Sequence, residues 1–195
     1  MAAKATSFIV DHYQQKAQAY NSVKNKTFYQ KIASELLKII PNQEVNSVLE
    51  VGGGSGFATV LLQQKYAQAK IVVLEPSKAL YLQGQKRLPQ AQWLNQTLAS
   101  FQPQQQFNLV FASMSGHWLS PLELKKLILL SANGCLALAL PFSVCSSTAN
   151  VNFYLKQLLF NLKAKPLWTK TTRSLNKLLN LLTPFSEIKT ESLVI

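Results

Sequence analysis

The stretch VLEVGGGSG, residues 48–56, decides the fold of this chain. An apolar run that contains one acid, Glu50, leads into three consecutive glycines, a serine and a fourth glycine. Glycine loses more conformational freedom on folding than any other residue, so this density of glycines indicates a turn where side chains would obstruct something. A turn between a buried strand and a helix exposes free N–H groups and lets a nucleotide approach the backbone. We therefore predict a nucleotide-binding loop here, with a purely structural glycine-rich turn as the alternative.

Strands and helices alternate on either side of this loop. Continuous apolar runs such as KIVVLE indicate strands that are buried on both faces, and helical spacing of apolar residues separates them. The predicted strands are 47–51, 70–75, 92–96, 107–113 and 135–140, and the predicted helices are 26–40, 56–66, 77–88 and 121–132. This order predicts an α/β fold with a parallel sheet and right-handed crossovers.

Composition sets the size and the charge of the protein. The chain has 195 residues, of which 48% are hydrophobic, so we expect one domain with one core. Its net charge is +12, and the basic residues are spread along the whole chain. Such a charge favours an acidic partner, which could be nucleic acid, anionic lipid or an acidic protein, although it also serves solubility alone.

Several classes of protein are excluded at this stage. The two cysteines and two histidines have no metal-ligand spacing and no disulfide-framework spacing, so we expect no metal. The first residues lack the apolar region of a signal peptide, and the most apolar run, 127–142, is interrupted by Asn133-Gly134. That run is also too short to span a bilayer. We expect a cytoplasmic protein that does not enter a membrane.

The spacing of the glycines distinguishes between nucleotides. The dinucleotide fingerprint G-x-G-x-x-G would need a glycine at position 57, where the chain has Phe57. Instead, the pattern E-x-G-x-G-x-G runs from Glu50 to Gly56, and this resembles motif I of class I S-adenosylmethionine (SAM) methyltransferases. A second acid, Glu75, ends the next strand, 19 residues after Gly56. A carboxylate at that position can accept hydrogen bonds from both ribose hydroxyls.

The resemblance implies a Rossmann-like class I methyltransferase fold, a mostly parallel sheet with helices on both faces, and SAM as cofactor. In the family, an acid near the end of the third strand reaches adenine, whereas here residues 95–98 offer only amide and hydroxyl groups. Asn108 likewise replaces an aspartate that is common at the start of the fourth strand. The implied cofactor-binding residues are Glu50, Gly52, Gly53, Gly54, Gly56, Glu75, Pro76, Asn95, Gln96, Thr97, Ser113 and Met114.

The exit of the fourth strand carries a weaker resemblance. The segment ASMSGHWLSP, residues 112–121, with residues 17–20 (AQAY), is similar to the malonyl-[acyl carrier protein] O-methyltransferases of biotin synthesis. This implies methylation of a carboxylate on a small molecule or on an acidic carrier protein. A carboxylate is already ionised at pH 7 and needs no general base. Candidates to line the acceptor side are Tyr13, Tyr20, His117 and Trp118, each of which could instead serve only in packing.

Other functions stay open. An RNA methyltransferase would also use the positive charge, but the chain has no Pro-Pro motif after the fourth strand for base-amine methylation. Cys145 follows the fifth strand without the second cysteine of 5-methylcytosine enzymes. A methyltransferase acting on another small molecule and a non-catalytic partner protein with this fold are the remaining readings.

The C-terminal part departs from the family. We divide a single domain, 1–195, into an N-terminal helical segment (1–45), a SAM-binding core (46–142) and a C-terminal part (143–195). Residues 150–163 and 171–182 are predicted helices, and 186–195 is one predicted strand. The family ends with two antiparallel strands, so the sheet is expected to be abbreviated. The last strand would then pair with strand 135–140 or leave a gap, and a second copy or another protein would cover the edge.

Overall fold

The computed structural model describes residues 2–40, 42–131, 134–139, 155–159 and 190–194. The helices are α1 (Ala2–Tyr20), α2 (Val23–Ile39), α3 (Phe57–Lys65), α4 (Lys78–Arg87) and α5 (Pro121–Leu130), with a short 3₁₀ turn at Gly116–Trp118. The strands are β1 (Ser47–Val51), β2 (Lys70–Leu74), β3 (Gln92–Leu94), β4 (Leu109–Ser113), β5 (Cys135–Ala139), β6 (Leu155–Leu159) and β7 (Thr190–Val194).

The first five strands form one parallel sheet in the order β3-β2-β1-β4-β5. The central strand is β1, in which Glu50 lies beside Val73 of β2 and Phe111 of β4. The strand order proceeds outward from β1 to both sides, with β2 and β4 as its two neighbours. Because all these strands are parallel, the carboxyl ends of β1, β2 and β4 meet at one edge, where ligands bind in open α/β sheets. The predicted Rossmann-like α/β fold is confirmed.

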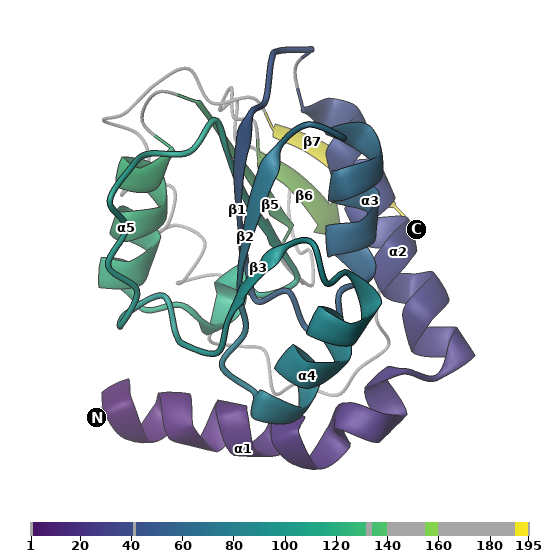
Figure 1. Ribbon diagram of the computed structural model, residues 1–195, viewed down its shortest axis with the longest axis vertical. Helices are drawn as coiled ribbons and strands as arrows, with labels where there is room; N and C mark the ends of the chain where they lie inside the picture. Colours follow the sequence, from purple (N-terminus) through teal and green to yellow (C-terminus); the bar gives the residue numbers. More distant parts are fainter. Residues whose placement is uncertain (1, 41, 132–133, 140–154, 160–189, 195) are drawn as a thin grey trace.

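Helices cover both faces of the sheet, as Figure 1 shows. Successive residues of β1 point to opposite faces, so Val48 packs toward α2 and α3 while Leu49 packs toward α5. The first face contains the fully buried Leu36 and Leu62, and the second contains Leu127. Each such side chain contributes about 1.5–3 kcal/mol when it leaves water. This two-sided core holds the central strand ends, and therefore the glycine loop, in place.

Helix α1 lies across the carboxyl edge of the sheet (Figure 1). Polar contacts with α4 hold it there: the Gln14 side-chain oxygen accepts hydrogen bonds from the Ala79 N–H at 2.9 Å and the Ser77 hydroxyl at 3.2 Å. The Gln83 amide donates to the carbonyl of Ala17, which is also buried. The N-terminal helical segment is therefore docked over the loop that the sequence identifies as functional.

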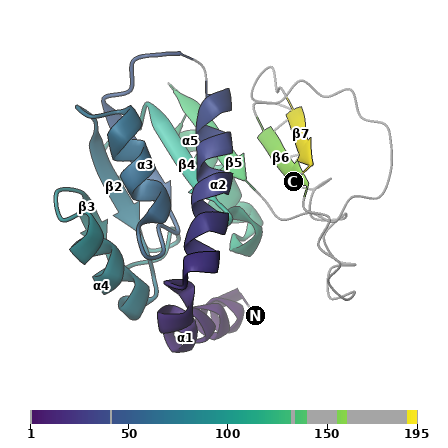
Figure 2. The same ribbon diagram turned by 90° about the vertical axis from the view of Figure 1, so that its right-hand side faces the viewer.

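The C-terminal strands differ from the sequence prediction. Residues 155–159, inside the predicted helix 150–163, form strand β6, because short apolar runs such as LKQLL suit a strand as well as a helix. The predicted strand at 186–195 does contain a strand, β7, but it pairs in parallel with β6 in a separate two-stranded sheet. Of the two predicted alternatives, pairing of this strand with β5 is therefore wrong. Figure 2 shows the pair beyond β5. The predicted helix 171–182 lies outside the described residues.

Candidate cofactor site and acceptor pocket

The glycine loop joins β1 to α3, and three of its glycines have positive φ: Gly52 at +74°, Gly54 at +57° and Gly56 at +85°. At Gly52, a Cβ atom would lie 2.5 Å from Cβ of Ser115, so a side chain has no room. At Gly54, a Cβ would meet only the Tyr20 ring, at 3.8 Å. Gly54 thus presents bare backbone to a pocket rather than to the protein interior.

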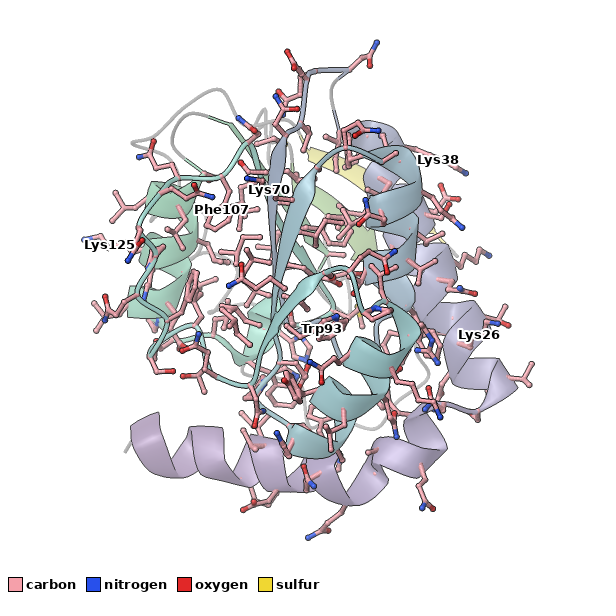
Figure 3. All side chains as sticks on the ribbon, viewed as in Figure 1. Lys26, Lys38, Lys70, Trp93, Phe107 and Lys125 are labelled. Carbon is pink, nitrogen blue, oxygen red and sulfur yellow. The ribbon has the colours of Figure 1, made fainter. Side chains whose placement is uncertain are left out.

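The other two glycines of the loop serve packing. A Cβ at Gly53 would lie 2.2 Å from Cγ1 of Val73, and one at Gly56 would lie 3.4 Å from the Trp93 ring. Trp93, labelled in Figure 3, is buried, and its indole N–H donates to the Leu88 carbonyl at 3.0 Å. It also packs so closely on Gly84 that a Cβ there would lie 2.1 Å away. The sequence analysis did not identify Trp93 as a residue that supports the glycine loop. The only signal was a tryptophan in a short edge strand.

Glu75 joins the end of β2 to the glycine loop. Its carboxylate accepts hydrogen bonds from the backbone N–H of Gly54 and the backbone N–H of Ser77, both at 2.8 Å. Burial raises the pKa of Glu75 to about 7, and these two hydrogen bonds oppose the rise. Each carboxylate oxygen can accept more than one hydrogen bond, so Glu75 retains capacity for a ligand.

The segment after β3 forms the next wall of the pocket. Gln96, Thr97 and Pro76, which the sequence predicts as cofactor-binding residues, line the pocket. Asn95 does not line it: its amide donates to the carbonyls of Glu75 and Pro76, at 2.8 and 2.9 Å. Asn95 therefore shapes the turn that carries Glu75, which is an indirect contribution to the site.

The end of β4 supplies the opposite wall. Ser113 and Met114, both predicted, line the pocket. Met114 has φ +62°, an uncommon conformation for a non-glycine residue that often marks functional sites. Its backbone N–H donates to the Ala139 carbonyl at 2.9 Å, while the Ser115 hydroxyl donates to the Val51 carbonyl. Ser115, which the prediction did not include, thereby joins the exit of β4 to that of β1.

An aromatic cluster closes the pocket on the predicted acceptor side. The Tyr13 ring lies edge-on to Tyr20 at 5.5 Å and to Trp118 at 6.3 Å, and all three residues line the pocket. Tyr29 of α2 stacks on Tyr20 at 4.8 Å and was not predicted. Burial raises the pKa values of Tyr13, Tyr20 and Tyr29, so their hydroxyls are neutral hydrogen-bond donors.

The two predicted residues of the 3₁₀ turn, His117 and Trp118, differ in whether they line the pocket. Trp118 is 43% exposed and lines the pocket, so it is not a core residue beneath the sheet edge. His117 does not line the pocket; its ring lies 4.4 Å from that of Trp118. Burial lowers the pKa of His117 to about 4, which keeps it neutral. Among the residues of the pocket wall that were not predicted are Ile9, Val10, Leu119 and Glu123.

Glu50 lies in a second, smaller chamber of about 40 Å³ behind the glycine loop. Its side chain is 2% exposed, and its Oε2 atom has no hydrogen-bond partner among the described residues. Burial raises the pKa of Glu50 to about 7, the Thr59 hydroxyl opposes that rise, and the charge of Glu75 adds to it. The sequence thus identified two acids that flank the loop, and the structure places them in different chambers.

Two negative findings complete the geometry. Within the described ranges, no three His, Cys, Asp or Glu residues gather in a group that could hold a metal ion. No described helix has both the length and the apolar character needed to cross a membrane.

The known proteins that this chain resembles are methyltransferases. Residues 48–132 match the family described as methyltransferase domain. Trans-aconitate 2-methyltransferase of Escherichia coli (strain K12 / DH10B) is 34% identical over 112 residues, which cover 56% of this chain and 44% of that protein. The corresponding protein of Shigella flexneri serotype 5b is 33% identical over the same coverage. The chain spans less than half the length of these curated relatives.

Solved structures share the fold at low sequence identity. Phosphoethanolamine N-methyltransferase 1 of Haemonchus contortus, in complex with phosphoethanolamine and S-adenosylhomocysteine, has a TM-score of 0.55 and 18% identity, covering 70% of this chain and 30% of its own. A putative methyltransferase of Haloferax volcanii, in complex with its Trm112 activator, has a TM-score of 0.52 and 15% identity, covering 59% and 53%. Residues 48–132 therefore match a methyltransferase domain, and the fold is that of solved methyltransferase structures.

Proposed function

We propose that this protein transfers the methyl group of SAM to a carboxylate oxygen of a small acceptor that carries several carboxylates. Trans-aconitate, named for the relatives at 33–34% identity, is the model acceptor. Bound SAM supplies a methyl group on a positively charged sulfonium, which an ionised carboxylate can attack directly. The protein then has to bind, align and desolvate the two reactants.

The described residues fit SAM. Gly54 offers open backbone to the pocket, with nothing but the Tyr20 ring within reach of a Cβ. Glu75 would accept the ribose hydroxyls with the lone pairs that Gly54 and Ser77 leave free. Gln96 would accept the adenine amino group through its side-chain carbonyl. These groups come from the ends of three neighbouring strands, as expected for a nucleotide at this edge of the sheet.

We choose a carboxylate as the acceptor because none of the described residues on the pocket wall is free to act as a base. The described residues that line the pocket include no Lys, Arg or His. Of the two acids on the wall, Glu75 is held by two backbone N–H groups, and Glu123 accepts hydrogen bonds from the N–H and hydroxyl of Ser120. An amine or hydroxyl acceptor would need deprotonation, whereas a carboxylate would not.

Neutral donors suit a carboxylate acceptor in a further way. The hydroxyls of Tyr13 and Tyr20 can donate hydrogen bonds to one carboxylate oxygen without neutralising the other. Their rings also cover the reacting centre and exclude water from it. In this account the phenols position the acceptor, and the rate gain comes from alignment of the reacting pair.

A malonyl group on an acyl carrier protein is the second acceptor to test, because carrier proteins are acidic and the chain carries +12. The relatives reported above do not support this finer prediction. Exposed lysines lie on opposite sides of the molecule, with Lys26 and Lys38 on α2 and Lys125 on α5 (Figure 3). The positive charge therefore favours encounter with an acidic protein without marking one docking face.

The test is methyl transfer from labelled SAM to trans-aconitate, malonyl carrier protein and bulk RNA in parallel. A methyl ester is cleaved by alkali to release labelled methanol, whereas N-methyl groups stay attached. The proposal predicts alkali-labile label on trans-aconitate or a similar polycarboxylate, and none on its trimethyl ester, which is the matched control. Label that appears only on RNA, or that resists alkali, would replace the proposal with another methyl acceptor.

A further inference from the structure

We infer that Arg87, the last residue of α4, is a positioning residue for methyl transfer, because it fixes the glycine loop relative to the end of helix α1. Helix α1 carries Tyr13 and Tyr20, which close the acceptor side of the pocket. Arg87 itself lines neither the main pocket nor the smaller chamber, so it acts on the reactants only through these two elements. The inference rests on the proposed function, since methyl transfer is the reaction that the positioning serves.

The first arm of the Arg87 guanidinium holds the glycine loop. Its Nη1 donates a hydrogen bond to the backbone carbonyl of Ser55, and its central carbon lies 4.1 Å from the centre of the Phe57 ring. A charged donor strengthens such a hydrogen bond, and a planar guanidinium packs well on an aromatic face. Ser55 and Phe57 flank Gly56, the last glycine of the loop, whose φ is +85°. Arg87 therefore holds the loop on both sides of the glycine that leads into α3.

The second arm holds the turn that follows α1. Nη2 of Arg87 donates to the side-chain oxygen of Asn21 at 3.0 Å, and the Asn21 amide donates to the side-chain oxygen of Gln83 at 2.7 Å. Asn21 directly follows Tyr20, which is the last residue of α1 and part of the pocket wall. Two nitrogens of one rigid planar group therefore fix the distance between the loop and the turn beside Tyr20.

The Arg87 contact is the last in a row of hydrogen bonds between α4 and α1, which lie side by side (Figure 1). The α4 groups in this row recur every four residues and so lie on one face of the helix: the Ala79 N–H, the Gln83 side chain and the Arg87 guanidinium. Their partners follow in the same order along the chain: Gln14, Ala17 and Asn21. Among the described residues of this row, Arg87 alone also donates directly to the glycine loop. It is therefore the point at which the docking of α1 is joined directly to the loop.

The two elements that Arg87 joins border the two reactants. The loop backbone at Gly54 borders the cofactor side, and a Cβ there would lie 3.8 Å from the Tyr20 ring. Methyl transfer requires the sulfonium methyl group and the attacking oxygen to be in contact and in line, and a misplacement of about 1 Å can cost about 100-fold in rate. Loss of the two-armed contact would shift these walls relative to each other, whereas each reactant would keep its own contacts. The rate constant kcat should therefore fall more than either binding affinity does.

Arg87→Lys tests the two-armed contact, because a lysine keeps the charge but has a single nitrogen in place of the planar fork. We expect kcat for methyl transfer from SAM to trans-aconitate to fall about tenfold or more. KM for trans-aconitate and the Kd of S-adenosylhomocysteine, the demethylated product of SAM, should change by less than about threefold. Lys86→Gln is the matched control. Lys86 is exposed and forms no hydrogen bond, ion pair or ring contact with the described residues, so its loss removes a charge and should leave kcat unchanged.

Asn21→Ala is a second variant, which keeps the inference testable if Arg87→Lys does not fold. It removes the arm toward α1 and leaves the arm toward the loop, so it should lower kcat as Arg87→Lys does. The two changes together should lower kcat little further, because they break the same contact. Wild-type kcat in folded Arg87→Lys, or an equal fall in Lys86→Gln, would overturn the inference.

Hydrogen exchange of the α1 amides needs no acceptor and separates this inference from the proposed function. We expect exchange in residues 13–20 to be at least about threefold faster in Arg87→Lys than in Lys86→Gln, because α1 is held less firmly. If the wild type methylates neither trans-aconitate nor a similar polycarboxylate, the proposed function fails and the exchange comparison decides the inference. Equal exchange rates in the two variants would then overturn it.

Discussion

The carboxylate of Glu75 and the backbone N–H of Gly54 form a 2.8 Å hydrogen bond that joins the end of β2 to the loop after β1. Residues 21 positions apart in the chain therefore set the shape of one ligand cradle. The same carboxylate also holds the Ser77 N–H at the start of α4. Loss of its charge should thus affect loop geometry and ligand contact together.

Glu75→Gln should weaken binding of S-adenosylhomocysteine by about 1–3 kcal/mol, or roughly 5- to 150-fold. A carboxamide can accept from one of the two backbone N–H groups only, since its other end is itself a donor. Calorimetry at pH 8 measures the effect. Glu123→Gln, on the same pocket wall but outside the predicted cofactor contacts, is the matched control. Equal affinity of wild type and Glu75→Gln would show that this carboxylate does not contact the ligand.

Gly54→Ala should abolish cofactor binding while the protein stays folded. The new Cβ has room in the empty pocket, since its nearest neighbour is Tyr20 at 3.8 Å, so the folding cost is about 1–2 kcal/mol for a positive φ. A bound nucleotide would need the space that the Cβ takes. Thermal unfolding with and without S-adenosylhomocysteine separates the two effects: we expect a small loss of Tm and no ligand-induced shift. A normal shift would place the ligand away from Gly54.

Gly84→Ala tests the packing account of Trp93. A Cβ at position 84 would lie 2.1 Å from the indole ring, which is held beneath the loop by its bond to Leu88. Overpacking of this kind costs about 1–3 kcal/mol, so urea unfolding should show a lower midpoint. The double variant with Trp93→Leu should recover part of that loss, because the smaller side chain removes the clash. A stable single variant would contradict the packing account.

The stability of the ligand-free protein should fall with rising pH through Glu50. Its pKa is raised from 4.5 to about 7 in the folded state, so its contribution is complete below pH 4.5 and lost as pH rises through 7. His117, whose pKa is lowered to about 4, acts in the opposite direction. Comparison with Glu50→Gln cancels that effect: relative to the variant, the wild type should lose at most about 1.4 kcal/mol per pH unit between pH 5 and 7. Parallel stability curves would mean that Glu50 is already ionised.

Trp118→Leu should raise KM for the acceptor and leave cofactor affinity unchanged, because Trp118 lines the pocket beside Tyr13 and is not among the residues predicted to bind the cofactor. His117→Gln is the neighbouring control, since His117 does not line the pocket. Steady-state kinetics with the acceptor that the labelling experiment identifies measures the acceptor site. Calorimetry of S-adenosylhomocysteine measures the cofactor site. An unchanged KM in Trp118→Leu would remove this residue from the acceptor side.

The parallel sheet and the position of the pocket at its carboxyl edge could be predicted because their signals are local. Glycine spacing, a second acid at the end of β2 and continuous apolar strands each reflect the backbone around them. Tyr29, Trp93 and Gly84 could not be predicted, because their importance depends on which helix packs beside which loop. The strand β6 was missed because a short run such as LKQLL has no decisive period. His117 was predicted together with Trp118 from the resemblance of segment 112–121, but adjacent residues in a 3₁₀ turn point to different surroundings.

Calorimetric titration of the full chain with S-adenosylhomocysteine tests the central claim most directly. The claim is that the glycine loop, Glu75 and Gln96 form one nucleotide cradle at the carboxyl edge of the sheet. We predict saturable binding of one ligand per chain at pH 8, with competition by SAM. Folded wild-type protein with no measurable heat at ligand concentrations of about 1 mM, which corresponds to about −4 kcal/mol, would contradict it.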